Sequence, residues 1–257
     1  DQADHPVKRR MKRFFFRQCD GIFVYGQRSA EYVIAMGADP AKIVYRCQAA
    51  ALPHTYSPEA AAAQRLANAA PADAPRFLFV GLVCRAKGIE DLLHAFVEVR
   101  RQQPAATLVL AGPPVEAEQL PQLAESLGVA DAVQFLGSMD ISQLAQQYSQ
   151  ATCLVLPSHT EAWGLVVNEA LSYGCPVVAS DCCGCIPELI QEGVTGHTFA
   201  TRDTNDLARA LMQATRSFAD VQATMQQCLN VAGQYTPACA GSSIMEGCMK
   251  ILEDTRA

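Results

Sequence analysis

The chain has 257 residues, of which 50% are hydrophobic and 18% are charged, so a sizeable core can form in one large domain or in one and a half ordinary ones. The formal net charge of −6 argues against a general nucleic-acid binder, because such proteins present a basic face. No segment reaches the ~18 unbroken apolar residues of a membrane-spanning helix. The polar, basic start also lacks the apolar region of a signal peptide.

The first fifty residues begin with a basic amphipathic segment, residues 8–17, in which lysines and arginines surround Met11 and Phe14, Phe15 and Phe16. Such a helix can lie on an anionic membrane surface. It can equally be a core helix with buried phenylalanines and solvated cations, and this second interpretation is favoured.

Short elements follow this segment. We expect a strand over residues 21–25, then a helix from Ser29, a suitable N-cap, to Met36. Gly37 should end that helix in the left-handed conformation. A second short strand is expected over residues 43–45. Residues 48–75 are rich in Ala and Pro and predict a linker that contains one helix, residues 58–68.

From Arg76 the pattern alternates between buried apolar runs and helical spacing, which predicts an α/β fold with a doubly wound, Rossmann-like parallel sheet. Ligands of such sheets bind at the carboxyl ends of the strands. We expect strands at residues 77–80, 107–111, 132–136, 152–156, 176–179 and 198–199. We expect helices at residues 89–101, 116–127, 141–149, 165–173, 187–192, 205–215, 219–232 and 242–254.

The 11 cysteines predict no disulfide framework, because their number is odd and the chain is long; they indicate a reducing, cytoplasmic setting. The run Cys182-Cys183-Gly184-Cys185, with Cys175 upstream, is open to two interpretations. It could form a metal or redox site, or it could supply small apolar side chains to a tight loop after a strand. No second Cys or His pair stands at zinc spacing, which favours the loop.

The most informative stretch is Pro157-Ser158-His159-Thr160-Glu161-Ala162-Trp163-Gly164-Leu165-Val166-Val167-Asn168-Glu169-Ala170. A buried strand precedes it, and a helix begins after Gly164. Strand, polar loop and helix N-terminus together form an anion site, because free backbone N–H groups and the positive end of the helix dipole face the ligand. Glu161 and Glu169 should therefore accept hydrogen bonds from hydroxyl groups on either side of the anion, such as those of a sugar and a ribose.

This stretch resembles the Glu-x7-Glu motif of retaining glycosyltransferases of the GT-B fold, in the large family 4. The resemblance extends over about residues 77–211. It includes Lys87-Gly88, Leu110-Ala111-Gly112, Phe135-Leu136-Gly137, Gly174-Cys175-Pro176-Val177-Val178-Ala179-Ser180, Gly184, Pro187-Glu188 and Gly193-Val194-Thr195-Gly196. An ordered series of this length is far more specific than a lone Glu-x7-Glu.

The resemblance implies a domain organisation. Residues 1–50 are similar to the end of the family's N-terminal acceptor-binding lobe, most of which has no counterpart here, so we expect a fragment with a truncated remnant of that lobe. Residues 51–75 would be the interdomain linker and residues 76–234 the nucleotide-sugar donor-binding domain. Residues 235–257 would form the C-terminal helix that crosses back to the N-terminal lobe.

The resemblance also implies roles for site residues. Lys87, in the loop that starts at Gly81, would neutralise the diphosphate. The family has an arginine where this chain has Leu82, so either Arg85 reaches the same phosphate or that contact is lost. Glu161 would lie near the donor sugar, and Glu169 would bind the ribose. Backbone N–H groups at Trp163, Gly164, Leu165 and Val166 would hold sugar and phosphates, and backbone at Phe135, Leu136 and Gly137 would hold the base.

The implied reaction is transfer of a hexosyl group from a nucleotide diphosphate sugar to a carbohydrate or lipid acceptor, with retention of configuration. No metal or other cofactor is expected, since Arg, Lys and the helix N-terminus neutralise the leaving diphosphate. We expect no nucleic-acid partner. The location would be cytoplasmic, with peripheral contact at the inner face of the membrane as an open alternative.

Three other function classes are alternatives to this one. The first is an inactive nucleotide-sugar-binding fragment that lacks the acceptor lobe. The second is a sugar-nucleotide epimerase of the same architecture, although such enzymes lack this Glu-x7-Glu context. The third is a Rossmann oxidoreductase, which is disfavoured because no Gly-x-Gly-x-x-Gly follows any strand.

Overall fold

A computed structural model describes residues 6–115 and 119–256 of the chain. The chain divides into two compact units: one holds the residues up to Ala50 together with those from Gln234 onward, and the other spans Ala51–Gly233. Part of one expected helix, residues 116–118, lies outside the described residues. No helix within the described ranges combines the length and the apolar character that crossing a membrane requires.

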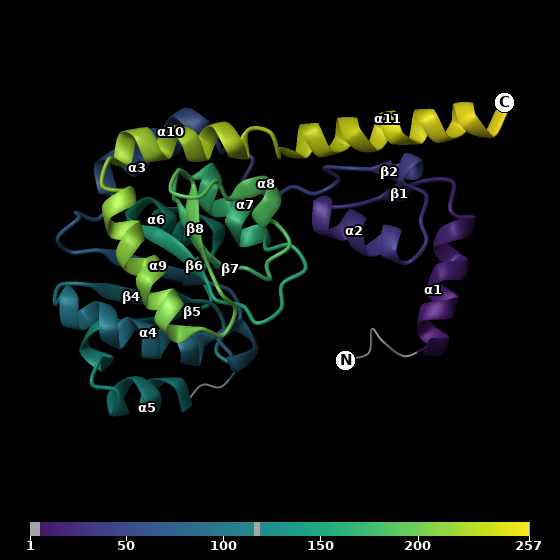
Figure 1. Cartoon of the computed structure of the whole chain (residues 1–257). Helices are drawn as coiled ribbons and strands as arrows, with labels where there is room; N and C mark the ends of the chain where they lie inside the picture. The colour runs from purple at the N-terminus through teal and green to yellow at the C-terminus, as the bar shows by residue number, and fades with distance from the viewer. Residues whose placement is uncertain (1–5, 116–118, 257) are drawn as a thin grey trace. The chain divides into compact units, whose positions relative to one another are not determined.

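The unit Ala51–Gly233 is built around a six-stranded, entirely parallel sheet of order β5-β4-β3-β6-β7-β8 (Figure 1). The inner strands β3, β6 and β7 are buried almost throughout, because helices cover both faces of the sheet; this explains their continuous apolar sequences. The strands are β3 Arg76–Val80, β4 Thr107–Ala111, β5 Val133–Gly137, β6 Cys153–Leu156, β7 Val177–Ser180 and β8 Gly196–Phe199.

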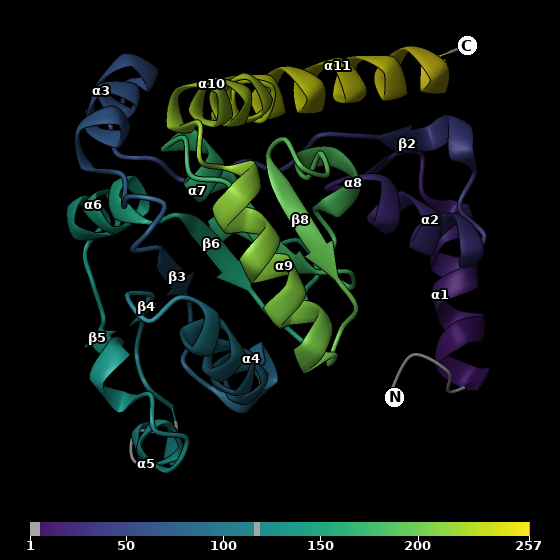
Figure 2. The same ribbon diagram turned by 60° about the vertical axis from the view of Figure 1, so that its left-hand side comes forward.

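Helices form a layer on each face of this sheet (Figure 2). One layer contains α4 (Ile89–Gln102), α5 (Gln119–Ser126) and α9 (Thr204–Ser217), whose apolar sides form one core with the strands. The other layer contains α3 (Pro58–Asn68), α6 (Ile141–Gln150), α7 (Leu165–Ser172) and α10 (Val221–Ala232). The short helix α8 (Ile186–Leu189) and the 3₁₀ turns η2 (Arg85–Lys87) and η3 (Ala130–Ala132) complete the unit.

The α/β prediction is therefore confirmed, with small changes at element ends. Helix α9 begins after Asp203 and α10 after Asp220, because each aspartate accepts a hydrogen bond from a backbone N–H in the first turn. Helix α11 begins at Pro237, five residues before the expected start. Proline fits the first turn of a helix, where its missing N–H costs nothing.

The segment that we expected to be a linker packs within the larger unit. The Tyr56 hydroxyl donates to the carbonyl oxygen of Ser172 at 2.7 Å. Arg65, on α3, is 2% exposed, and its guanidinium donates to the carbonyls of Tyr148, Ser149 and Ala151, where α6 ends. A buried arginine that satisfies helix C-terminal carbonyls fixes α3 against α6, so these residues belong to the packed unit.

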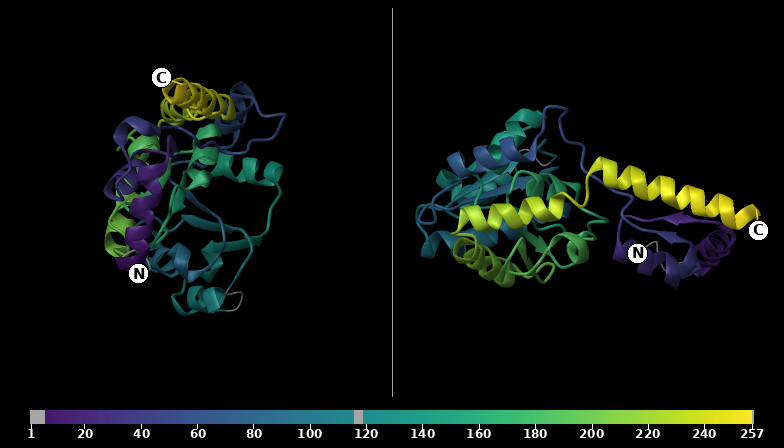
Figure 3. Two further views of the ribbon diagram at one scale, coloured as in Figure 1. Left: turned by 90° about the vertical axis from the view of Figure 1, so that its right-hand side faces the viewer. Right: turned by 90° about the horizontal axis from the view of Figure 1, so that it is seen from above.

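The smaller unit contains α1 (Pro6–Gln18), α2 (Gln27–Ala35), η1 (Pro40–Lys42) and two short parallel strands, β1 (Ile22–Phe23) and β2 (Ile43–Val44). Helix α11 (Pro237–Arg256) lies beside these strands (Figure 3). The close approach occurs at Gly247, where an added Cβ would lie 2.7 Å from a methyl group of Val44. Residues far apart in the sequence thus form one unit.

Two expectations for this unit need comment. The predicted cap at Ser29 is wrong: helix α2 begins after Gly26, and Ser29 lies inside it. The predicted helix end is confirmed, since Gly37 has φ +93° and its N–H donates to the carbonyl of Ile34.

The favoured prediction of buried phenylalanines in helix α1 is wrong, because none of the three is buried. Phe14 is 70% exposed, Phe15 is 62% exposed and Met11 is 68% exposed. Only Phe16 packs against the small apolar cluster of this unit. The reason is size: two strands of two residues each offer too little apolar surface to cover more than one side of the helix.

Candidate functional site

The candidate site lies where the strand order reverses. From β3 the chain adds strands on one side of the sheet, through β4 to β5, and from β6 it adds them on the other, through β7 to β8. The loops after β3 and β6 therefore leave neighbouring strands at the same edge of the sheet. Such a switch point is the usual ligand site of an open α/β sheet. We call residues 81–88 and 157–164 the phosphate loops, after the role that the sequence predicts for them.

The two phosphate loops touch through their backbones. Gly88 has φ +71°, and a Cβ there would lie 1.9 Å from the carbonyl oxygen of Pro157. The N–H of His159 donates to the carbonyl of Ala86 at 3.3 Å, and the His159 ring lies 2.7 Å from a carboxylate oxygen of Asp91 on α4. His159 is thus held on the scaffold by its backbone N–H and by its ring.

Lys87 and Glu161 meet between these loops. The Lys87 Nζ donates to the Glu161 carboxylate at 2.7 Å, and both side chains are partly buried. The pair thus puts a cation and a carboxylate at one point between the loops. Arg85 takes another direction: its Nε lies 2.7 Å from a carboxylate oxygen of Glu90, in the first turn of α4, and its side chain is 58% exposed.

Helix α7 begins beside this pair. Gly164, its N-cap, has φ +103°, and the first intrahelical turn closes with the Val167 N–H donating to the Gly164 carbonyl. The N–H groups of Leu165 and Val166 lie ahead of the first hydrogen bond of the helix. Together with the positive end of the helix dipole, they would form the anion site that the sequence predicts.

The phosphate loop after β6 is fixed by two contacts that the sequence did not indicate. The Trp163 ring is buried, and its Nε1–H donates to the Asn168 side-chain oxygen at 2.8 Å, so the ring anchors the loop to α7. The loop after β7 also binds it: the N–H groups of Gly184 and Cys185 donate to the carbonyls of Glu161 and Trp163.

Glu169, one turn inside α7, lies in a different environment. Its carboxylate accepts a 2.8 Å hydrogen bond from the Tyr148 hydroxyl. Burial raises the pKa of Glu169, and the Tyr148 hydrogen bond opposes this rise in part. Burial, and then the nearby charge of Glu169, raise the pKa of Tyr148 well above its ordinary value. The Tyr148 ring stacks on Tyr173, with ring centroids 5.7 Å apart.

A cavity of about 250 Å³ opens over this group; we call it the Tyr148 cavity. It is lined by Ala51, Leu52, Met139, Ile141, Leu144, Tyr148, Glu169 and Tyr173. An apolar cavity with one carboxylate at its wall suits a flat ring that carries hydroxyl groups. Among described residues, the lining contains Met139 but not Phe135, Leu136 or Gly137, which lie on the edge strand β5 just before it. Tyr148 and Met139 were missed by sequence reasoning.

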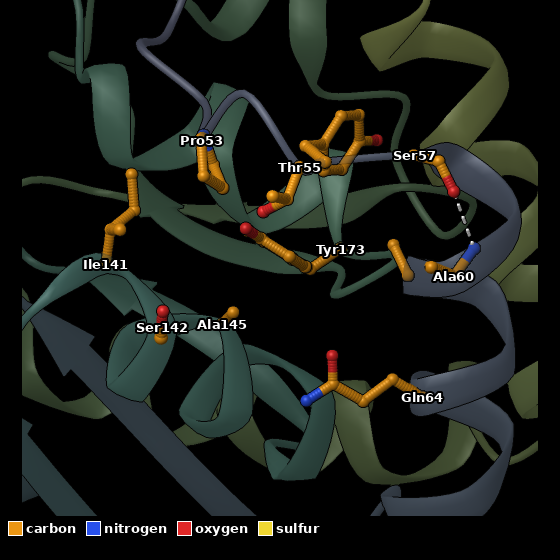
Figure 4. A pocket seen from close by; sticks show the side chains of 11 residues that line it. Pro53, Thr55, Ser57, Ala60, Gln64, Ile141, Ser142, Ala145 and Tyr173 are labelled. Carbon is orange, nitrogen blue, oxygen red and sulfur yellow. Dashed lines mark hydrogen bonds between the residues drawn. The ribbon is translucent and has the colours of Figure 1, made fainter.

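A second hollow of about 280 Å³ adjoins the first, since Ile141 and Tyr173 line both. Figure 4 shows Tyr173 between the segment that carries Pro53 and Thr55 and the first turns of α6. The lining of this second hollow contains both polar and apolar side chains, and Gln64 faces α6.

Glycines stand in the site where two backbone segments approach closely. Gly81 has φ +146°. A Cβ on Gly112 would lie 1.8 Å from the Gly81 carbonyl oxygen, and one on Gly184 would lie 1.9 Å from that of Ala162. Gly184 thus provides a close contact between the loop after β7 and the loop after β6.

Comparisons with known proteins agree with this architecture. A D-inositol 3-phosphate glycosyltransferase of Actinosynnema mirum is 36% identical over 183 residues, which cover 68% of this chain and 43% of that protein. A D-inositol 3-phosphate glycosyltransferase 2 of Catenulispora acidiphila is 30% identical over 243 residues, or 90% of this chain and 56% of that protein. The chain thus spans about half the length of the curated relatives it matches.

Solved structures share the fold. Sucrose-phosphate synthase from Thermosynechococcus elongatus superposes with a TM-score of 0.76 and 25% identity, over 100% of this chain and 64% of that one. Anabaena HepE, solved in complex with UDP, gives a TM-score of 0.74 and 20% identity, over 97% of this chain and 70% of that one. Residues 61–222 match the family described as glycosyl transferases group 1. The match takes in both phosphate loops and Glu169, and the chain belongs to this family.

Proposed function

We propose that this chain binds a nucleotide diphosphate sugar and forms the donor half of a retaining glycosyltransferase, which passes a hexosyl group to a carbohydrate or lipid acceptor. The observation that carries the proposal is the Lys87–Glu161 pair at the sheet's switch point, directly beside the free N-terminus of α7. Sugars and diphosphates need this combination of a cation, oriented N–H groups and a carboxylate.

Each residue has a task in this proposal. Lys87 and the α7 N-terminus neutralise the charge that develops on the leaving diphosphate, without a metal ion. Glu161 accepts hydrogen bonds from the donor sugar, and Trp163 and Gly164 offer backbone N–H groups to it. Glu169 accepts hydrogen bonds from the ribose hydroxyls at the wall of the Tyr148 cavity. The base lies against the backbone of Phe135–Gly137.

Similar proteins indicate which ligand to test first. HepE has been solved with UDP and with UDP-glucose, and UDP is therefore the first probe for this chain. Thermal shift against a panel of nucleoside diphosphates and their sugars should show stabilisation by at least one base. Absence of any stabilisation across the panel, with binding also undetectable by calorimetry, would overturn the donor role.

The runner-up is a module that binds the nucleotide sugar but does not transfer the sugar. Transfer also needs a positioned acceptor and exclusion of water, which supply much of the barrier reduction. The two proposals separate in an assay of sugar transfer and donor hydrolysis with the chain as it stands, with Lys87→Ala as the inactive control. Binding without turnover favours the module; turnover that the control lacks favours the transferase.

The proposal also includes peripheral contact of this chain with an anionic membrane surface, on the cytoplasmic side. Helix α1 supports it, since exposed Phe14 and Phe15 stand among arginines and lysines. Sedimentation with vesicles that contain an anionic phospholipid should carry the chain down, and the double substitution Phe14→Ser, Phe15→Ser should release it. Equal sedimentation of both forms would remove helix α1 from the proposal.

A further inference from the structure

Tyr148, near the end of helix α6, is held by its backbone and by its ring. The side chain is 1% exposed, and the ring stacks on Tyr173 with an angle of 9° between the ring planes. Tyr173 in turn meets the Tyr56 ring edge-on, at 84°. The backbone carbonyl of Tyr148 accepts a hydrogen bond from the Arg65 guanidinium at 3.1 Å. Because a close-packed ring of this kind has little freedom to move, the Tyr148 hydroxyl occupies a fixed position.

The fixed hydroxyl holds one oxygen of Glu169. It donates to Oε2 of the Glu169 carboxylate at 2.8 Å, and within the described residues no other hydrogen bond to this carboxylate is seen. A carboxylate has about four lone-pair sites, so further sites remain for a ligand. They lie at the wall of the Tyr148 cavity, which Glu169 lines. A glutamate whose rotamer is fixed before the ligand arrives loses less conformational entropy on binding.

Stability alone does not account for this choice of acceptor. A buried tyrosine hydroxyl needs a partner, but a backbone carbonyl is enough, as the bond from Tyr56 to the Ser172 carbonyl shows. Burial raises the pKa of Glu169, so its charged form is disfavoured, and the Tyr148 hydrogen bond opposes this effect. The other titratable neighbour is Tyr173, whose pKa is raised by burial and then by this carboxylate. Among the described residues that line the cavity there is no lysine, arginine or histidine. The Tyr148 hydroxyl therefore supports a charged acceptor at the cavity wall.

We propose that Tyr148 is a positioning residue of the nucleotide site: its hydroxyl orients the Glu169 carboxylate toward the ribose hydroxyls and thereby sets the preference of the site for ribonucleotides over deoxyribonucleotides. This inference rests on the proposed function, in which Glu169 binds the ribose. Tyr148 acts through Glu169 in this role. Its loss should therefore weaken the binding of ligands that carry the ribose hydroxyls more than the binding of ligands that lack them.

The first experiment compares UDP with dideoxy-UDP, which lacks both ribose hydroxyls, by calorimetry on the whole chain. ADP and dideoxy-ADP form a second pair with a purine base. We call the affinity for the ribonucleotide divided by that for its dideoxy analogue the ribose ratio. In wild type this ratio should be at least about tenfold, because the hydroxyls donate to a charged group. Tyr148→Phe keeps the ring that stacks on Tyr173 and should lower the ribose ratio about fivefold.

The matched control is Tyr56→Phe, which removes a hydroxyl beside the same Tyr173 ring but one that is bound to a backbone carbonyl; the ribose ratio should stay at the wild-type value. Glu169→Ala should lose the ribose ratio, and adding Tyr148→Phe to it should change nothing further. A wild-type ribose ratio in Tyr148→Phe, together with its loss in Glu169→Ala, would overturn the positioning role and leave the proposed function intact. A wild type that binds both ligands of each pair equally would remove Glu169 from ribose binding, and this inference with it.

The second experiment follows the ribose ratio with pH, which a purely structural role of Tyr148 would not affect. The phosphates titrate alike in both ligands of a pair, so their contribution cancels. Loss of the Tyr148 hydrogen bond should raise the pKa of Glu169 further. The ratio, which needs the charged carboxylate, should therefore fall at a higher pH in Tyr148→Phe than in wild type.

A second replacement keeps the test valid where Tyr148→Phe does not fold. With 3-fluorotyrosine in place of Tyr148 the hydroxyl is retained and is a stronger donor, because the phenol is more acidic. The fall of the ribose ratio should then move to a lower pH than in wild type. Profiles that coincide for wild type and the replaced forms would overturn the inference.

Discussion

The phosphate loops and the Tyr148 cavity each contain a glutamate, and the two glutamates lie in different environments. Glu161 is paired with a lysine at the mouth of the site, where both charges keep some contact with water. Glu169, eight residues later, is shielded on the side of α7, where it accepts a hydrogen bond from a tyrosine hydroxyl. The difference follows from position: one glutamate precedes the helix in a loop, and the other lies on the helix face that packs against α6. In the proposed function, charge is therefore recognised at one end of the site and hydroxyl groups at the other.

The strongest test of this division removes the contact that shapes the phosphate end. Gly184→Ala places a Cβ 1.9 Å from the Ala162 carbonyl oxygen, where backbone meets backbone. We expect the free energy of unfolding to fall by about 2–3 kcal/mol, with loss of diphosphate binding. Urea denaturation measures the first effect. The control Gly241→Ala, with nothing within 4 Å on an exposed part of α11, should gain stability instead. Equal effects of the two changes would contradict the role of the loop contact.

Charge at the phosphate end is tested by Lys87→Ala. Loss of a charge-assisted contact should weaken nucleoside diphosphate binding by about 1.5–3 kcal/mol. Binding of the nucleoside alone should change little, because the Tyr148 cavity is intact. Calorimetry with both ligands measures the contrast, and Lys250→Ala, on α11, serves as the control. A parallel loss for nucleoside and diphosphate would show that Lys87 acts on the scaffold and not on the phosphates.

The nucleoside end is tested by Glu169→Ala. We expect both the nucleoside and its diphosphate to bind more weakly by about 1.5–3 kcal/mol, since the ribose belongs to both. The fold should persist, which circular dichroism can verify. Unchanged affinity by calorimetry would exclude Glu169 from ribose binding.

A smaller effect concerns pH. The pKa of Glu169 in the folded chain lies above its ordinary 4.5, so the folded state holds this proton more tightly than the unfolded state. Stability of the free chain should therefore fall as pH rises from the ordinary pKa through the raised one, by about 1.4 kcal/mol for each pH unit that separates the two pKa values. Glu169→Gln should lack this fall, whereas exposed Glu253→Gln should keep it. Denaturation curves at several pH values that stay parallel for wild type and Glu169→Gln would contradict the buried state of this carboxyl.

The smallest effect is expected at Arg85. Its ion pair with Glu90 is largely exposed, so Arg85→Glu should change stability by less than about 1 kcal/mol. A loss of diphosphate affinity in this variant would show that Arg85 replaces the arginine that the family has at position 82. Affinity equal to wild type would leave Lys87 as the side-chain cation of the phosphate end.

Sequence patterns predicted the elements that local chemistry determines. The apolar runs of β3 and β6 are buried as expected, and the strand order brings Lys87 to Glu161 across 74 residues. The partner of Glu169 was not predictable, because nothing around Tyr148 indicates that α6 packs beside α7. The exposure of Phe14 was missed for a similar reason: an amphipathic pattern shows that a helix has an apolar side, but not whether the unit has enough surface to cover it.

Hydrogen exchange with and without a nucleoside diphosphate tests the central claim most directly. In the free chain the N–H groups of Leu165 and Val166 precede the first hydrogen bond of α7 and should exchange quickly. Ligand phosphates that accept from them should slow this exchange, together with that of residues 81–88, while helix α2 stays unchanged. Protection confined to other parts of the larger unit, with residues 164–166 exchanging as before, would contradict a diphosphate site at the α7 N-terminus.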